Sequence, residues 1–85
     1  MSEKETAIVI FNNVEKKITA DIEIPLNITA NDLVIALNTA FNLGIDTTNI
    51  KSCFLKSEDP IALLKGNKRL SEFGIRNGST INFTE

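Results

Sequence analysis

The stretch Thr29–Ile45, TANDLVIALNTAFNLGI, has the periodicity of one amphipathic helix and organises the rest of the chain. Apolar residues recur in it at spacings of i, i+4, i+7 and i+8, which brings them onto one helical face. Those residues are Leu33, Leu37, Ala40 and Phe41. The other apolar segments have the character of strands, so the sequence predicts one long helix with a sheet folded against it.

Both ends of this predicted helix carry residues that begin or stop helices. Thr29 can accept a hydrogen bond from the first turn, and Asp32 three residues later completes a pair like a capping box. Asp32 also places a negative charge where the helix dipole favours one. Gly44 followed by Ile45 is typical of a C-terminal stop, so we expect the helix to end there.

Two strands are predicted before the helix. Thr6–Phe11, TAIVIF, is apolar on both faces and is expected at the centre of a sheet. Lys17–Ile24 alternates strictly between apolar and polar residues, which predicts a strand with one wet face. The short link between them favours an antiparallel hairpin, and Pro25 ends the second strand because it cannot donate to a ladder.

Three short strands and a compact turn are predicted after the helix. The expected segments are strands at Ile50–Lys56, Ile61–Lys65 (at an edge) and Ser79–Thr84, and a core-pinned turn at Leu70–Ile75. Asn77-Gly78 is the strongest hairpin-type turn in the chain. The helix should carry the chain across the sheet, with the next strand parallel to an earlier one. The order ββαββ-turn-β predicts an α+β fold, a mixed sheet of about five strands on one helix. We expect the chain to form a single domain over residues 1–85, with residues 1–5 frayed.

The composition argues against several classes of protein. The net charge is −2, divided into −4 over residues 1–48 and +2 over residues 49–85, which argues weakly against a nucleic-acid binder. The longest apolar runs are five residues, whereas a membrane span needs about 20, so we expect no membrane insertion. A single cysteine and no signal-like N-terminus favour a cytoplasmic location.

Few residues in the chain are suited to catalysis or metal binding. The sequence has no His, and so neither an imidazole base nor a His-anchored metal site. Cys53 lies in an apolar segment and is interpreted as a core residue rather than a nucleophile. Glu58 and Asp59, before Pro60, indicate a turn rather than a cation site. We expect no catalytic residue, no metal, no cofactor and no small-molecule substrate.

Two groups of charged residues leave alternatives open. Asp21 and Glu23, on the wet face of the second strand, are either an electrostatic docking edge or ordinary solvated residues. A nucleic-acid-binding module would use the basic residues of the second half, but these lack interleaved aromatic residues and the chain is acidic overall. Those residues are Lys51, Lys56, Lys65, Lys68, Arg69 and Arg76.

The segment Lys68–Ile81, KRLSEFGIRNGSTI, resembles the closing segment of ubiquitin-like proteins. In that family this segment begins with a basic or polar residue and continues with the pattern Leu-Ser-acidic-aromatic-x-Ile. A polar turn follows, and then Ser-Thr-Leu before the last strand. The order of strands and the capped helix agree as well, so the resemblance implies a ubiquitin-like β-grasp fold over nearly the whole chain. The residues at the family's core positions are Leu70, Phe73, Ile75, Ile81 and Phe83.

Within this superfamily the chain is most similar to the small YukD group, also called EsaB-like, of bacterial type VII secretion loci. The similarity implies a non-catalytic cytoplasmic accessory or regulatory component of the secretion apparatus. Its partner would be a protein, expected to be a membrane-associated secretion component. The residues that carry the similarity are Ile50-Lys51, Asn67–Leu70, Gly74-Ile75 and Asn77-Gly78.

The end of the sequence departs from conjugated ubiquitin-like proteins and from sulfur carriers. Those proteins close with a Gly-Gly tail whose carboxylate becomes adenylated, whereas this sequence ends Phe83-Thr84-Glu85. We therefore expect neither conjugation nor sulfur transfer, and a sulfur carrier or modifier is the alternative function. A thioester adduct formed with an activating enzyme and ATP would refute this expectation.

The third predicted strand supplies the candidate binding residues. Side chains alternate along a strand, so either Phe54 or Leu55 should face away from the helix. The resemblance to ubiquitin implies a receptor-binding patch on that face, flanked by Lys51, Lys68 and Arg69. The alternative is that both faces of this strand are covered.

Overall fold

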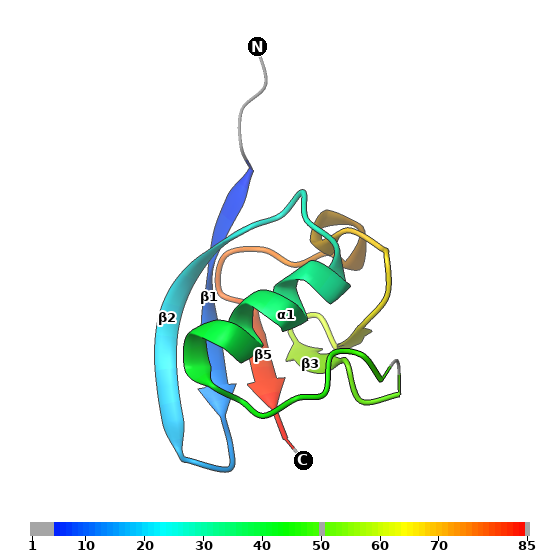
Figure 1. The fold of residues 1–85 in the computed structure, drawn as a ribbon. Coiled ribbons are helices and arrows are strands. Elements are labelled where there is room, and N and C mark those ends of the chain that lie inside the picture. The colour runs from blue at the N-terminus through cyan, green and yellow to red at the C-terminus, as the bar shows by residue number, and fades with distance from the viewer. Residues whose placement is uncertain (1–4, 50, 85) are drawn as a thin grey trace.

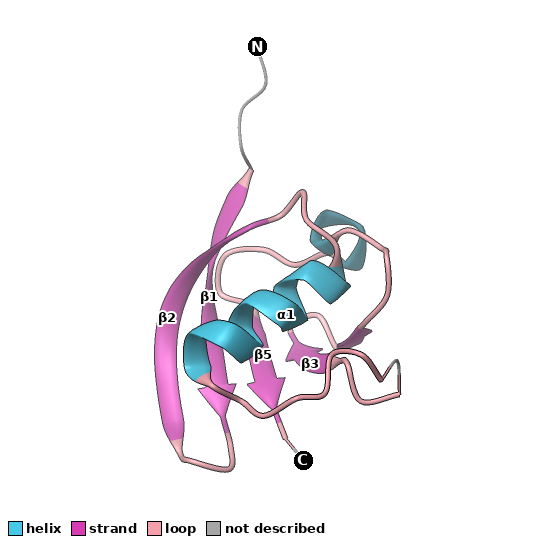
Figure 2. Ribbon diagram, viewed as in Figure 1, coloured by secondary structure: helices cyan, strands magenta, loops and turns pink. Residues whose placement is uncertain are grey.

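One helix crosses one face of a five-stranded sheet in the computed structural model, which describes residues 5–49 and 51–84 (Figure 1). Figure 2 shows the two layers, with α1 in front of the strands. This arrangement confirms the predicted α+β class and element order. The elements are β1 (Thr6–Asn13), β2 (Ile18–Pro25), α1 (Ala30–Phe41), β3 (Leu55–Glu58), β4 (Ala62–Leu64), the 3-10 helix η1 (Leu70–Phe73) and β5 (Thr80–Phe83). Of the predictions for the chain ends, residues 1–4 and Glu85 lie outside the described residues, as does Ile50.

The hairpin of β1 and β2 follows the predicted alternation. The two strands pair antiparallel, with Ala7 opposite Ile24, Val9 opposite Ile22 and Phe11 opposite Ala20. Ala7, Val9 and Phe11 are buried on the face that α1 covers. β1 pairs with β2 on one side and β5 on the other, so its predicted central position is confirmed.

The parallel pair of the sheet differs from the expected one. The strand order is β2-β1-β5-β3-β4, in which β5 runs parallel to β1 and β3 runs antiparallel to β5. β3, the strand after the helix, therefore has the direction of β2 without pairing with it. The last strand, and not the strand after the helix, makes the parallel pair.

The helix begins where predicted and ends earlier than predicted. Thr29 Oγ1 accepts a hydrogen bond of 3.1 Å from the Asp32 N–H, which confirms the cap. At the other end α1 stops at Phe41, because Asn42 adopts the left-handed conformation that Gly44 was expected to supply. The Asn38 side chain then bonds both the N–H and the C=O of Ile45, at 2.8 and 3.1 Å, and holds the chain away from the helix axis.

The strand predicted over residues 50–56 is wrong in its first half. β3 begins only at Leu55, because Asn49 draws the chain before it into turns. The Asn49 carbonyl accepts from the N–H groups of Ser52 and Cys53 at 3.0 Å each, and its side chain accepts from the Lys51 N–H at 3.0 Å. These local bonds replace ladder bonds that a longer strand would have made.

The closing segment is packed into the core and tied to β1. Leu70 and Ile75 are buried, so the predicted compact turn is confirmed, in the form of the 3-10 helix η1. The Asn77-Gly78 turn leads from this segment into β5 instead of closing a hairpin. It is tied to β1, since the Ile8 N–H donates to Asn77 Oδ1 at 2.8 Å and the Gly78 N–H donates to the Ile8 carbonyl at 2.9 Å.

The core lies between α1 and the inner face of the sheet. Leu33 and Leu37 of the helix pack there with Phe11, whose ring centroid lies 4.7 Å from that of Phe41. Ala40, which the periodicity placed on the buried face, is exposed. No helix in the described part of the chain is long and apolar enough to cross a membrane.

Candidate functional site

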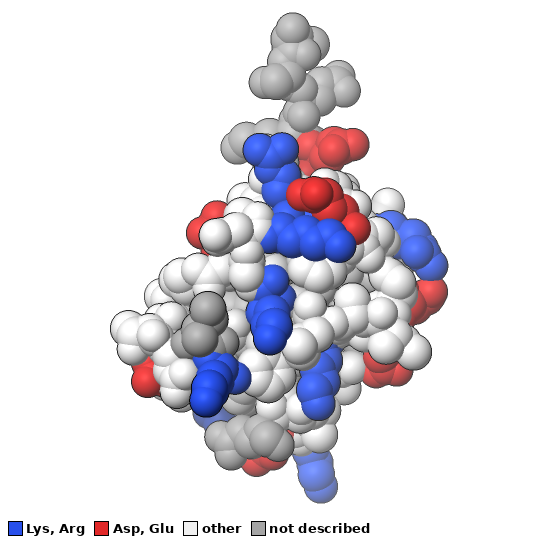
Figure 3. Space-filling view, turned by 90° about the vertical axis from the view of Figure 1, so that its right-hand side faces the viewer, with Lys and Arg blue, Asp and Glu red and all other residues white. Residues whose placement is uncertain are grey.

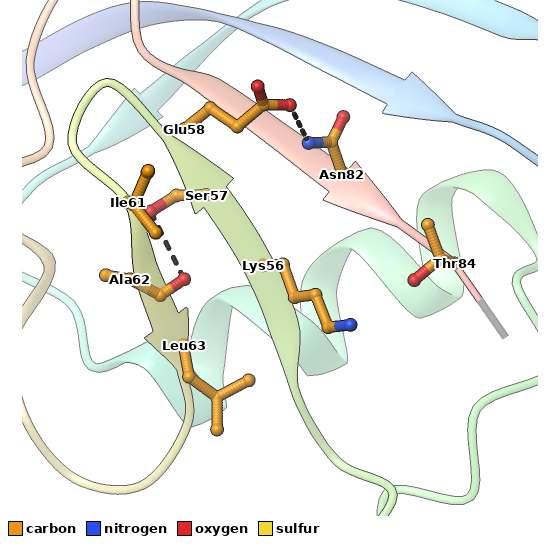
Figure 4. Close-up of a pocket in the computed structure, with 8 residues that line it drawn as sticks. All are labelled: Lys56, Ser57, Glu58, Ile61, Ala62, Leu63, Asn82 and Thr84. Atoms are coloured by element: carbon orange, nitrogen blue, oxygen red, sulfur yellow. Dashed lines mark hydrogen bonds between the residues drawn. The ribbon is translucent and has the colours of Figure 1, made fainter.

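A shallow groove lies on the outer face of the sheet, away from α1, where β3, β4 and β5 run side by side (Figure 4). The alternation along β3 builds it, because Leu55 and Ser57 point into the core while Lys56 and Glu58 point outward. The strand register places Leu63 of β4 and Asn82 of β5 on either side of Lys56. The outward residues of the groove are Lys56, Glu58, Ile61, Leu63, Asn82 and Thr84.

One wall of the groove is apolar. Ile61, in the turn before β4, is 90% exposed, and Leu63, which stands opposite Lys56 in the register, is 44% exposed. A single exposed apolar residue is ordinary on a protein surface, but two that line one hollow make one side of it apolar. This wall can receive an apolar side chain of another protein.

The other wall is polar and held in place by hydrogen bonds. Asn82 Nδ2 donates to Glu58 Oε2 at 2.6 Å, and Asn12 Nδ2 donates to Asn82 Oδ1 at 3.2 Å. Thr19 Oγ1 in turn donates to Asn12 Oδ1 at 3.4 Å. These contacts cross β3, β5, β1 and β2, so the Glu58 carboxylate is oriented before any partner arrives.

A second hollow adjoins the groove at Thr84, which lines both. It contains the half-buried ring of Phe54 together with Lys51, and lies against the segment that follows α1. Viewed from the side that lies on the right in Figure 1, lysine and arginine side chains are spread over the surface and acidic ones lie mainly at its margins (Figure 3).

Comparison with known proteins identifies the family. The sequence pattern of one family, described as protein YukD of the WXG100 protein secretion system (Wss), matches residues 9–82. The chain belongs to the YukD family. A search of curated protein sequences gave no significant match.

Solved structures with the same fold are ubiquitin-like domains. The ubiquitin-like domain of tubulin-binding cofactor B superposes with a TM-score of 0.72 at 20% identity, covering 94% of this chain and 89% of that one. The C-terminal ubiquitin-like domain of mouse tubulin-specific chaperone e gives 0.69 at 10% identity, covering 100% and 93%. The UBL domain of Plasmodium falciparum Dsk2 gives 0.60 at 17%, covering 94% and 100%. The YukD-family chain therefore has the ubiquitin-like β-grasp fold predicted from its sequence.

The structure separates the predicted binding residues of this YukD-family chain. Leu55 is 1% exposed, so its place in a surface patch is wrong, because the alternation of β3 directs it into the core. Phe54 and Lys51 meet in the second hollow. Lys68 and Arg69 lie instead at the start of α1, where the Ala30 N–H donates to the Lys68 carbonyl and Arg69 forms a bridge with Thr29. Neither of these two lines the groove.

Sequence reasoning missed Ile61, Leu63 and Asn82. The edge strand near Ile61 was predicted, but the face that each of its side chains occupies depends on its register with β3. The one available signal was the pair Ile61 and Leu63, since two apolar residues at alternate positions share a face of a strand.

The single cysteine of this YukD-family chain is a core residue, as predicted. Cys53 is buried in the loop before β3, and its thiol lies 3.1 Å from Asn31 Oδ1. Burial raises the pKa of the Cys53 thiol, and the negative charge of Asp46 adds to this effect. Among the described residues, no three acidic, histidine or cysteine side chains converge in a way that could hold a metal ion.

Asp46 beside the second hollow should titrate at unusually low pH. The Thr48 hydroxyl and N–H donate to Asp46 Oδ1 at 2.6 and 3.1 Å, and these bonds lower the pKa of this carboxyl, the hydroxyl contributing most. We expect Thr48→Ala to raise the pKa of Asp46 toward its ordinary value of 3.8, and Thr48→Ser to leave it low. Carboxyl titration by NMR measures both values.

The sign of the effect on stability follows from this pKa. Because folding lowers the pKa of Asp46, its contribution to stability is present above the pKa of the unfolded chain and is lost as the pH falls through the folded value. Wild type should therefore lose more of its stability in acid than Thr48→Ala does. An unchanged pKa of Asp46 in Thr48→Ala would show that the hydroxyl bond does not control it.

Proposed function

We propose that this chain is a non-catalytic protein-binding module that acts as a cytoplasmic accessory or regulatory component of a WXG100, or type VII, secretion system. The observation that carries the proposal is the YukD-family match over residues 9–82. The groove on β3, β4 and β5 supplies the contact surface, and the partner is a membrane-associated protein component of that system.

The proposed contact uses the groove as it stands. Its polar wall is already oriented, so binding requires little ordering of side chains and loses little free energy to it. An apolar side chain of the partner fills the wall of Ile61 and Leu63, and charged groups at the rim pair with Lys56 and Glu58. An anchor of this kind, surrounded by weaker polar contacts, carries most of the binding energy in many protein interfaces.

The chemistry of the described residues supports the non-catalytic part of the proposal. The one thiol, Cys53, is buried and its pKa is raised, whereas a nucleophilic cysteine needs an accessible thiolate. The sequence offers no histidine to act as a base. The output of the module would then be a bound partner and not a chemical product.

A binding experiment with membranes that contain the secretion apparatus tests the role and the surface together. The purified chain is immobilised and exposed to detergent-solubilised membranes from cells that express the secretion locus, and the bound protein is identified by mass spectrometry. We expect wild type to retain a component of the secretion apparatus. The double change Ile61→Asp and Leu63→Asp should weaken that binding at least about tenfold, because it places two charges on the apolar wall.

The chain offers a matched control for the groove variant. Ile35→Asp changes an isoleucine of α1 that is 42% exposed, on the opposite layer of the molecule, and should leave the binding unchanged. Loss of binding in Ile35→Asp but not in the groove variant would contradict the assigned surface. Retention of no secretion component by wild type would contradict the assigned role.

A further inference from the structure

β2 is a long strand at the edge of the sheet. It extends over Ile18–Pro25 and pairs with β1, and no other strand of the described residues pairs with its second side. The opposite edge, β4, has only three residues. Figure 1 shows β2 along the outer margin of the molecule. An edge of this length is a template for an added strand unless the protein blocks it.

The register identifies the backbone groups that β2 leaves unpaired. The Leu26 N–H donates to the Glu5 carbonyl at 2.8 Å, one step beyond the pair Thr6–Pro25, so this step is a hydrogen-bonded pair. Bonded and non-bonded pairs alternate along antiparallel strands. The N–H and C=O groups that point away from β1 are therefore those of Thr19, Asp21 and Glu23.

Two observations support this assignment. Ile8 and Ile10, the partners of Glu23 and Asp21, direct their N–H groups to the opposite side, toward Asn77 and Ser79. Pro25, which has no N–H, falls in the outward set, where a proline costs the sheet no ladder bond. The free edge thus presents one donor and one acceptor from each of the three residues.

The side chains along this edge differ on its two faces. Thr19, Asp21 and Glu23 are exposed on the outer face and carry two negative charges. On the inner face Ile18 is 46% exposed, and Ile22 is only partly buried. A strand added here would place alternate residues beside the acidic row and the others beside the apolar row.

We propose that β2 binds an extended protein segment in which Lys or Arg alternates with apolar residues, so that the segment becomes an added edge strand. Its backbone bonds the outward groups of Thr19, Asp21 and Glu23. Its basic side chains pair with Asp21 and Glu23, and its apolar side chains extend the row of Ile18 and Ile22. This surface is separate from the groove, because β2 and β4 lie at opposite edges of the sheet.

The same charges select against a second copy of the chain. An antiparallel pair of two β2 strands centred on Asp21 would place the two Asp21 carboxylates opposite each other. A shift of the register by two residues, which centres the pair on Ile22, would place Asp21 opposite Glu23 of the other copy. Like charges directly opposite one another destabilise a sheet, so the edge favours a basic partner over itself.

Titration with two short peptides tests the proposal on the intact protein. The probes are acetyl-Lys-Val-Lys-Val-Lys-Val-Lys-amide and the same peptide with Glu for Lys, followed by NMR of the labelled chain. We expect the lysine peptide to bind, with shifts concentrated on β2, and the glutamate peptide to bind at least about tenfold more weakly. Raising the salt concentration should weaken the lysine complex.

Variants of the edge make the result specific. Asp21→Lys with Glu23→Lys should exchange the preference, so that the glutamate peptide binds more tightly. Asp21→Asn with Glu23→Gln keeps the shape of both side chains and should weaken the lysine peptide without this exchange. The groove variant Ile61→Asp with Leu63→Asp should bind the lysine peptide like wild type, which separates this test from that of the proposed function.

Methylated peptides test the backbone bonds directly. In an antiparallel complex the lysine N–H groups face β2, so N-methylation of the lysines should abolish binding and N-methylation of the valines should not. A parallel complex reverses the two results and also supports strand addition. Equal binding of both methylated peptides, an unchanged preference in the charge-reversed variant, or shifts outside β2 would overturn the proposal.

Discussion

Replacing Phe11 with alanine is expected to lower the free energy of unfolding by about 3–5 kcal/mol. Phe11 is fully buried on β1, the strand that joins the hairpin to β5, and its ring packs against Phe41. Its cross-strand partner is Ala20, which is too small to fill the space that the ring would leave. Domains of this size are stable by only about 5–15 kcal/mol, so the variant should be close to unfolding.

Urea denaturation followed by circular dichroism measures this loss, and β1 supplies its control. Ile8 lies three residues away with its side chain on the outer face, where it is 56% exposed. Ile8→Ala should therefore cost no more than about 1 kcal/mol. Similar losses in the two variants would show that Phe11 does not occupy the centre of the core.

Leu55→Ala is expected to lower the free energy of unfolding by about 2–5 kcal/mol. The side chain of Leu55 is enclosed between the sheet and α1, and Leu64 stands opposite it on β4. The matched change Leu63→Ala removes the same group from a half-exposed position on the neighbouring edge strand, β4. Its cost should be about 1 kcal/mol or less.

The same two variants should affect partner binding in the reverse order, so that Leu63→Ala has the larger effect. At a temperature where both are folded, Leu63→Ala removes part of the apolar wall and should weaken the proposed partner complex, whereas Leu55→Ala should leave the affinity close to that of wild type. The unfolding free energies and affinities of both variants are measured side by side. Equal unfolding losses would contradict the assigned faces of β3 and β4, and stronger loss of binding in Leu55→Ala would contradict the assigned groove.

The local patterns of the sequence were sufficient for most of the fold. Strict alternation located β2 and its inner face, and Thr29 located the start of α1, because both signals act between near neighbours. The start of β3 was not predictable in this way. Residues 51–54 have the composition of a strand, but the bonds that residues 51–53 form with Asn49 take precedence.

The candidate site was harder to predict because its residues come from separate strands. The sequence restricts Phe54 and Leu55 to opposite faces without saying which face is buried. That choice depends on the pairing of β3 with β4 and β5, which no local pattern fixes. Lys68 and Arg69 were grouped with Phe54 by analogy, and the backbone bonds at the start of α1 place them elsewhere.

Photocrosslinking in secreting cells tests whether the groove contacts a component of the secretion system. Benzoylphenylalanine replaces Leu63 on the groove wall in one strain and Ile35 on the outer side of α1 in another. We expect a crosslink from position 63 to one secretion component and none from position 35. A crosslink to that component from position 35 and not from position 63 would show that the groove is not the contact surface.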